Sequence, residues 1–244
     1  MVEGNTTANF RAELPHPIDL QGEWQVGLAE FQYPVTYDTI RGCYYDVRMH
    51  DDTLHRVRIN NNFYSTPQAL DRAIQYATKS WWRQVEADKD GHGVHVQYPV
   101  AFYYAEDQMR MCAQINHTKV KEVTLDDRLR HALGFAESKL GFNTVAKYAV
   151  DVTAGLDTMF VYCSLVSPQY VGDTKTNLLK IIPLRGTPGS IQQLDFPNIH
   201  YCDLQVNRFS DVSFSIKGGD GANIPFNFGK VYVKLHLRKK KLFM

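Results

Sequence analysis

Apolar and polar residues alternate near the C-terminus of this chain, and this pattern constrains the fold more than any other feature. Val212, Phe214 and Ile216 alternate with polar residues, and the same alternation returns over residues 230–238. Successive side chains of a β-strand point to opposite faces of a sheet, so this period indicates strands with one buried face. Between the two runs, the turn-forming segment Gly218–Gly221 predicts a hairpin that joins them.

The same alternation recurs in several earlier segments. Residues 100–104 and 109–115 are expected to form two strands joined by a turn, and residues 148–152 and 202–206 repeat the pattern. In Glu23–Tyr33 the apolar phase slips by one residue midway, which is what a β-bulge produces. Many strands and few helices predict a β-sandwich, and the jelly roll is a leading candidate for it.

Only two segments have helical spacing. The first is expected to begin at Thr66 as the N-cap, with Pro67 in the first helical position. The second is expected to begin after Thr124 as its cap and to end at Gly134. Both lie in the middle third of the chain. We therefore expect one jelly-roll domain over residues 1–244, with an inserted, partly helical elaboration at about residues 60–145.

Composition restricts the class of protein. The 244 residues include 27 basic and 26 acidic side chains, a balance that argues against a dedicated nucleic-acid-binding protein. No apolar stretch is long enough to span a membrane, and Met1–Phe10 is too polar for a signal peptide. We therefore expect a reducing compartment. The four cysteines are widely spaced and suit neither a zinc site nor a disulfide framework, and Cys163 and Cys202, which lie in apolar strand patterns, are expected to act as small buried apolar residues.

Residues that could carry catalysis are scarce in this sequence. Two pairs of histidines, His50 with His55 and His92 with His95, could hold a metal, but neither pair has a familiar ligand spacing. Polar loops explain both pairs better. The sequence contains no nucleophile elbow of the G-x-S-x-G type. We therefore predict no catalytic, cofactor-binding or metal-binding residue, and no enzyme activity.

Two other features suggest contact with partners. Trp81 and Trp82 are adjacent on the first expected helix, where neighbouring side chains point about 100° apart. At least one indole should then lie outside the buried stripe and could belong to an interface, although packing under a local loop is an equal alternative. The basic run at the C-terminus is most simply a solvated terminus, and the alternative is contact with packaged nucleic acid or a neighbouring subunit; its residues are Arg238, Lys239, Lys240 and Lys241.

Three stretches in order, Leu20–Pro34, Ser167–Thr174 and Pro225–Arg238, resemble a known family. They are similar to the penton, or minor capsid, proteins of Polinton/Maverick-type elements, which have relatives in adintoviruses and virophages. The resemblance covers most of the chain and is weakest across the helical middle. It implies a single jelly roll that forms homopentamers at the fivefold vertices of an icosahedral capsid. It also implies a location in the virion and a double jelly-roll major capsid protein as partner.

Two other classes of function remain open from the residues alone. A jelly-roll module could bind a carbohydrate or a host receptor, with Trp81 or Trp82 as a stacking platform. A metal-dependent enzyme of the cupin type would instead use the histidines at positions 50, 55, 92 and 95.

Overall fold

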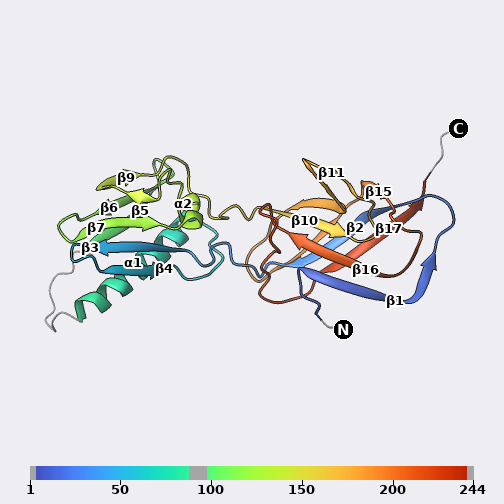
Figure 1. The fold of residues 1–244 in the computed structure, drawn as a ribbon, viewed down its shortest axis with the longest axis horizontal. Helices are drawn as coiled ribbons and strands as arrows, with labels where there is room; N and C mark the ends of the chain where they lie inside the picture. Colours follow the sequence, from blue (N-terminus) through green and yellow to red (C-terminus); the bar gives the residue numbers. More distant parts are fainter. Residues whose placement is uncertain (1–3, 88–97, 241–244) are drawn as a thin grey trace. The chain divides into compact units, whose positions relative to one another are not determined.

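The structure, a computed structural model, describes residues 4–87 and 98–240. The chain forms two compact units (Figure 1). One unit, called here the sandwich unit, combines Met1–Tyr37 with Leu156–Met244, and the other, the inserted unit, comprises Asp38–Gly155. The elaboration expected at residues 60–145 falls inside the inserted unit, which extends beyond it on both sides.

The described part of the sandwich unit consists of β-strands. They are β1 (Asn9–Asp19), β2 (Trp24–Pro34), β10 (Thr158–Cys163), β11 (Gln169–Val171), β12 (Thr174–Thr176), β13 (Leu178–Pro183), β14 (Ile191–Asp195), β15 (Tyr201–Asp203), β16 (Arg208–Lys217) and β17 (Tyr232–Lys239). The first sheet has the order β1-β16-β10-β13. In the second sheet, β2 pairs with β17 on one side and with β14 and β15 on the other. Strands β11 and β12 form a separate hairpin.

All strand pairs in this unit are antiparallel (Figure 1). The core consists of the alternate, buried residues of both sheets, such as Leu28 and Phe31 of β2 with Val161 of β10 and Ile216 of β16. The prediction of an all-β, single jelly-roll sandwich with a partly helical insertion is confirmed.

The bulge predicted in Glu23–Tyr33 is also present. Lys234 of β17 pairs with Glu30, whereas the next residue, Leu235, pairs with Leu28. Ala29 is thus the extra residue on β2. The slip in the apolar phase had the expected cause, because the bulge lets residues on both sides of it face the same core.

The predicted hairpin across Gly218–Gly221 is wrong in its pairing. A tight turn does exist there, with the Gly218 amide donating to the Ala222 carbonyl at 2.8 Å. However, β16 pairs with β1 and β10 in the first sheet, while β17 pairs with β2 in the second. Alternation shows that each strand has one buried face, but strands on opposite sides of one core have the same alternation.

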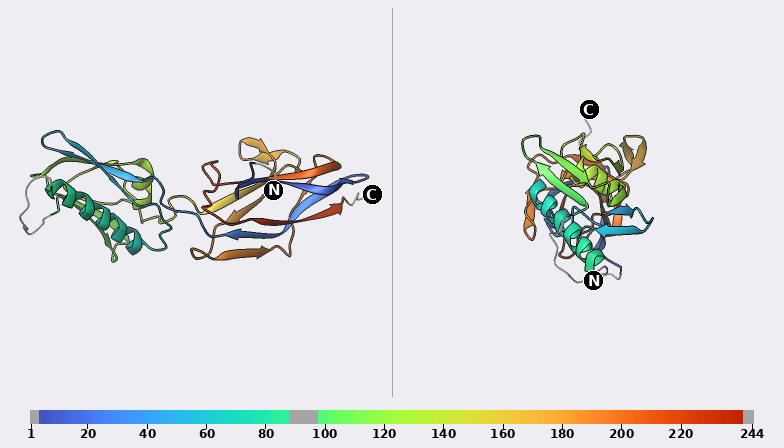
Figure 2. Two further views of the ribbon diagram at one scale, coloured as in Figure 1. Left: turned by 90° about the horizontal axis from the view of Figure 1, so that it is seen from below. Right: turned by 90° about the vertical axis from the view of Figure 1, so that its left-hand side faces the viewer.

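The inserted unit contains both helices and the remaining strands. These are β3 (Tyr44–Met49), β4 (Leu54–Arg58), α1 (Pro67–Ala87), β5 (Val100–Ala105), β6 (Arg110–Ile115), β7 (Val120–Leu125), α2 (Asp127–Leu133), β8 (Lys139–Leu140) and β9 (Asn143–Val145). They form two sheets, β4-β3-β7-β8 and β5-β6-β9. Figure 2 shows α1 running along these strands, and α1 lies beside β5 and β4.

The strands expected at 100–104 and 109–115 are β5 and β6, which pair as predicted. Residues 148–152 are not a strand. Instead, the Tyr148 amide donates to the Gly134 carbonyl at 2.9 Å, which holds this segment against the end of α2. The strand predicted at residues 148–152 is therefore wrong, because so short a run of alternating residues also occurs outside strands.

The helix termini follow the sequence with one correction. Helix α1 begins after Thr66, whose hydroxyl accepts from the Ala69 amide at 3.2 Å, as expected of an N-cap. Thr124 is not the cap of α2, because it belongs to β7; Asp126 caps the helix instead and accepts from the amides of Arg128 and Leu129. Gly134 ends α2 in the left-handed conformation, as predicted. Within the described residues, neither helix is long and apolar enough to cross a membrane.

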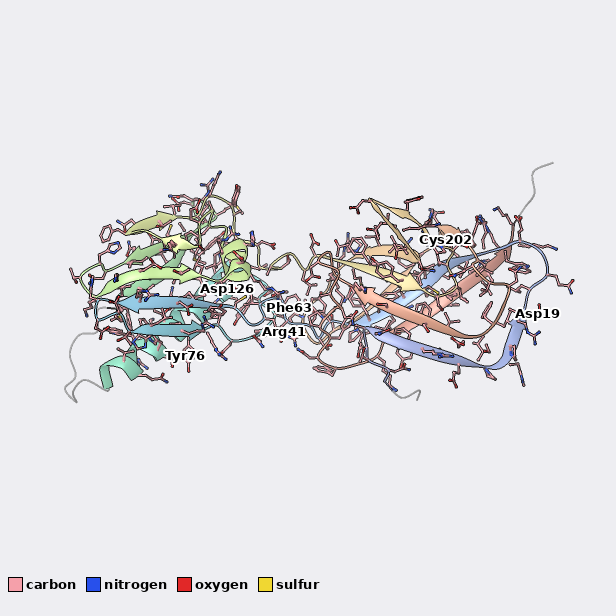
Figure 3. All side chains as sticks on the ribbon, viewed as in Figure 1. Asp19, Arg41, Phe63, Tyr76, Asp126 and Cys202 are labelled. Carbon is pink, nitrogen blue, oxygen red and sulfur yellow. The ribbon has the colours of Figure 1, made fainter. Side chains whose placement is uncertain are left out.

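All four cysteines are buried and free, and the burial predicted for Cys163 and Cys202 is confirmed; Figure 3 labels Cys202 in the sandwich unit. Burial raises the pKa of Cys163 to about 11, and burial, with the nearby Asp126 carboxylate, raises the pKa of Cys43 to about 11. At pH 8 such a thiol is thiolate in about one molecule in a thousand. These two residues should therefore be unreactive in the folded protein.

We expect an alkylating reagent at pH 8 to leave Cys43 and Cys163 unmodified during the time in which it fully labels the chain in guanidinium chloride. Peptide mapping by mass spectrometry measures this for each cysteine. Rapid labelling of Cys163 in the native protein would contradict its burial in the sandwich core.

Candidate assembly interface

The two tryptophans singled out from the sequence are both buried. Trp81 and Trp82 are only 8% and 5% exposed, and their ring centroids lie 5.6 Å apart. The expectation that one indole lies outside the buried surface is wrong. The His55 ring covers Trp81, and the Lys119 ammonium lies 5.1 Å from the Trp82 ring, so the packing alternative describes both. A subunit contact through these residues stays a prediction.

The basic run at the C-terminus is largely engaged within its own unit. Arg238 lies over the Tyr201 ring at 3.6 Å and donates to the Gln25 side chain at 3.0 Å. Lys240 forms ion pairs with Asp203 at 3.2 Å and with Glu23 at 3.7 Å. Lys239 is exposed at the end of β17. Lys241 lies outside the described residues.

The histidines considered as metal ligands have other contacts. His50 Nε2 lies 2.6 Å from the His117 carbonyl oxygen, and His55 packs on Trp81. No group of three or more metal-ligating side chains occurs among the residues that the structure describes. His92 and His95 lie outside those residues. His50 and His55 therefore contact neighbours within the inserted unit.

Large apolar side chains gather at one end of the outer face of the second sheet. Ile191 of β14 lies opposite Pro34 of β2, and Tyr232 of β17 lies opposite Gln32 of the same strand. Gly229 packs so closely on Pro34 that an added Cβ would lie 2.8 Å from the proline ring, which brings Phe228 to this end as well. Ile191, Phe228 and Tyr232, which we call the apolar patch, are 64%, 67% and 58% exposed.

The remainder of this outer face is polar and internally paired. Lys234 of β17 forms an ion pair with Glu30 of β2. Farther along, the Tyr201 hydroxyl and His236 Nδ1 lie 2.9 Å apart. At the far end, hydrogen bonds from Gln25 and Lys240 hold the pKa of Asp203 below its usual value. An exposed apolar area bordered by polar residues is typical of a protein–protein interface.

The outer face of the first sheet offers a second apolar area. Phe160 of β10 lies between Lys217 of β16 and Ile181 of β13, and Ile181 is 48% exposed. Next to it, a shallow groove of about 490 Å³ is lined by Tyr162 together with serines of β16. The sandwich unit thus has partly apolar surfaces on the outer faces of both sheets.

The sequence patterns alone did not indicate these surfaces. One signal was available for Tyr232, because this aromatic residue stands in the polar, outward phase of the run at residues 230–238. Ile191 and Phe228 gave no comparable signal, since their exposure depends on which strands pair. The apolar patch is assembled from β14, β17 and the segment before β17, which only the fold brings together.

The described residues define a class: a jelly-roll sandwich with an inserted α/β unit and an outer sheet face suited to protein association. Among solved structures, this chain is similar to the crystal structure of the mavirus penton protein, with a TM-score of 0.52 and 10% identity. That alignment covers 95% of this chain and 91% of the mavirus protein.

A cryo-electron microscopy structure of the Sputnik virophage also contains a similar chain, at a TM-score of 0.40 and 11% identity, covering 96% of this chain and 92% of the other. No family model matches the sequence, and no curated protein matches it either. At this level of identity, the similarity to the mavirus penton protein establishes the fold alone.

Proposed function

We propose that this chain is a penton-type minor capsid protein that forms homopentamers at the fivefold vertices of an icosahedral capsid. The observation that carries the proposal is the full-length correspondence with the mavirus penton protein, which includes both the sandwich and the insertion. The three stretches that resemble the pentons of Polinton/Maverick-type elements support it. They coincide with β2, the β11–β12 hairpin and β17 of the sandwich unit.

The surfaces of the sandwich unit fit the geometry that a ring requires. Closure of a ring by identical subunits needs a heterologous interface, in which one flank of a subunit meets a different flank of the next. The outer faces of the two sheets are such a pair of flanks. We assign the apolar patch to one side of each contact and the area around Phe160 and Ile181 to the other.

In this proposal the protein is structural and has no catalytic role. Its location is the virion, and its partner outside the ring is a double jelly-roll major capsid protein. Contact between the basic run and packaged DNA would be weak, because a phosphate would compete with Asp203 and Glu23 for Lys240. The whole chain, residues 1–244, then acts as one capsid subunit that carries the inserted unit.

Native mass tests the proposal most directly. Five copies of the 28.0 kDa chain amount to about 140 kDa, and we expect native mass spectrometry and light scattering to report this mass. Measurement over a hundredfold range of protein concentration separates a weak ring from a monomer. A protein that stays monomeric at the highest concentration would contradict the proposal, as would a closed dimer.

A further inference from the structure

The inserted unit has a hollow on the outer face of the β5-β6-β9 sheet that the proposed function does not use. Ala101 of β5, Gln114 of β6 and Asn143 of β9 lie in one row across the three strands, with their side chains on this face. The hollow has a volume of about 670 Å³, within the usual range for small-ligand sites. Because Ala101 has only a methyl group, it leaves the floor open.

Two aromatic rings stand at the margins of the hollow. Tyr98 precedes β5, and Phe142 precedes β9. These strands are the two edges of the sheet, so the rings lie at opposite edges of the same face. Each ring has one neighbour: Lys79 Nζ lies 5.9 Å from the centroid of the Tyr98 ring, and the His117 ring lies 5.8 Å from that of Phe142. Phe142 is nevertheless 60% exposed. An exposed aromatic ring can receive a flat apolar ligand surface at little entropic cost, because its side chain has only two rotatable bonds.

Carboxamides supply the polar groups of the hollow. Gln114 and Asn143 lie on its floor, and Asn116 lies beside them. The Asn116 oxygen accepts from the amide and the hydroxyl of Thr118 at 3.0 and 2.7 Å, which fixes this side chain with its nitrogen available as the donor. Carboxamides both donate and accept, as ligand hydroxyl groups do. None of the described residues that line the hollow is charged.

We propose that this hollow binds a neutral oligosaccharide. Rings at its two margins match the apolar C–H faces of sugar rings, and the carboxamides between them match the hydroxyl groups. Among the described residues, the lining carries no charge, which disfavours a phosphate or an acidic sugar, because each would need a cationic partner inside the hollow. Trp81 and Trp82 take no part, because both are buried. The inference concerns the inserted unit alone and is independent of whether the sandwich units form a ring.

A glycan array probed with the full-length protein tests the inference, with affinities then measured by titration of free oligosaccharides. We expect binding to neutral glycans and none to acidic ones. Phe142→Ala should weaken binding at least about tenfold, and Ala101→Leu, which fills the floor, should abolish it. Tyr76→Ala is the matched control, because Tyr76 is a 69% exposed aromatic residue on α1 (Figure 3) that does not line the hollow.

Three outcomes would overturn the inference: no binding to any neutral glycan, binding to acidic glycans only, or binding that Phe142→Ala and Ala101→Leu leave unchanged. Thermal unfolding of each variant shows whether it is folded. Phe142 is exposed and Ala101 half-buried on the outer face, so we expect both variants to fold.

Discussion

The double variant Ile191→Glu/Tyr232→Glu is expected to convert the proposed pentamer of about 140 kDa into a 28.0 kDa monomer. Both side chains belong to the apolar patch and are exposed in the single chain, so the change should barely affect folding. At a subunit contact, however, each glutamate would be buried without a partner, at a cost of several kcal/mol. Because a ring repeats the contact five times, the loss should be complete. Light scattering and native mass spectrometry measure it.

Tyr170→Ser is the control for this experiment. Tyr170 is 80% exposed on the β11–β12 hairpin, away from the apolar patch, and its replacement should leave the pentamer intact. Ile181→Glu tests the opposite flank, and we expect it to dissociate the ring as well. A double variant that remains pentameric would show that the apolar patch lies outside the subunit contact, and the assignment of flanks would then be wrong.

Gly134→Ala should destabilise the inserted unit by about 3 kcal/mol or more. Gly134 ends α2 at a φ of +78°, a conformation that costs an L-residue about 1 kcal/mol. In addition, a Cβ would lie 2.3 Å from the Tyr148 carbonyl oxygen and 2.9 Å from that of Ala149. Both are backbone atoms, so the segment could yield only by giving up its hydrogen bond to Gly134. Urea denaturation followed by tryptophan fluorescence measures the change, since Trp81 and Trp82 belong to this unit.

Gly42→Ala separates the two contributions. Gly42 has a φ of +67° in the same unit, but a Cβ there would meet nothing within 4 Å. We expect a loss of about 1 kcal/mol, from backbone strain alone. If Gly134→Ala were no more destabilising than Gly42→Ala, the close approach of Tyr148 to Gly134 would not be a feature of the folded protein.

Trp81 and Trp82 illustrate what a prediction from the spacing of one helix leaves out, since one indole was expected to be exposed and both are buried. Helical spacing correctly places the two indoles in different directions, and for a helix packed on one side this leaves one of them exposed. In the structure, neighbours cover both directions. His55, at the start of β4, covers one indole, and Lys119, just before β7, covers the other. Their positions depend on contacts between residues more than 25 apart, which no local pattern encodes.

The alternation over Val212–Arg238 determined, by itself, that this chain contains strands with one buried face, and the slip after Leu28 determined a bulge. These features are local consequences of backbone geometry, so the sequence contains them in full. Only the tertiary structure decided that β16 and β17 belong to different sheets, and that Ile191 and Tyr232 lie on the same outer face. Strand pairing depends on the free energy of the whole core, because each face could be buried equally well against more than one partner.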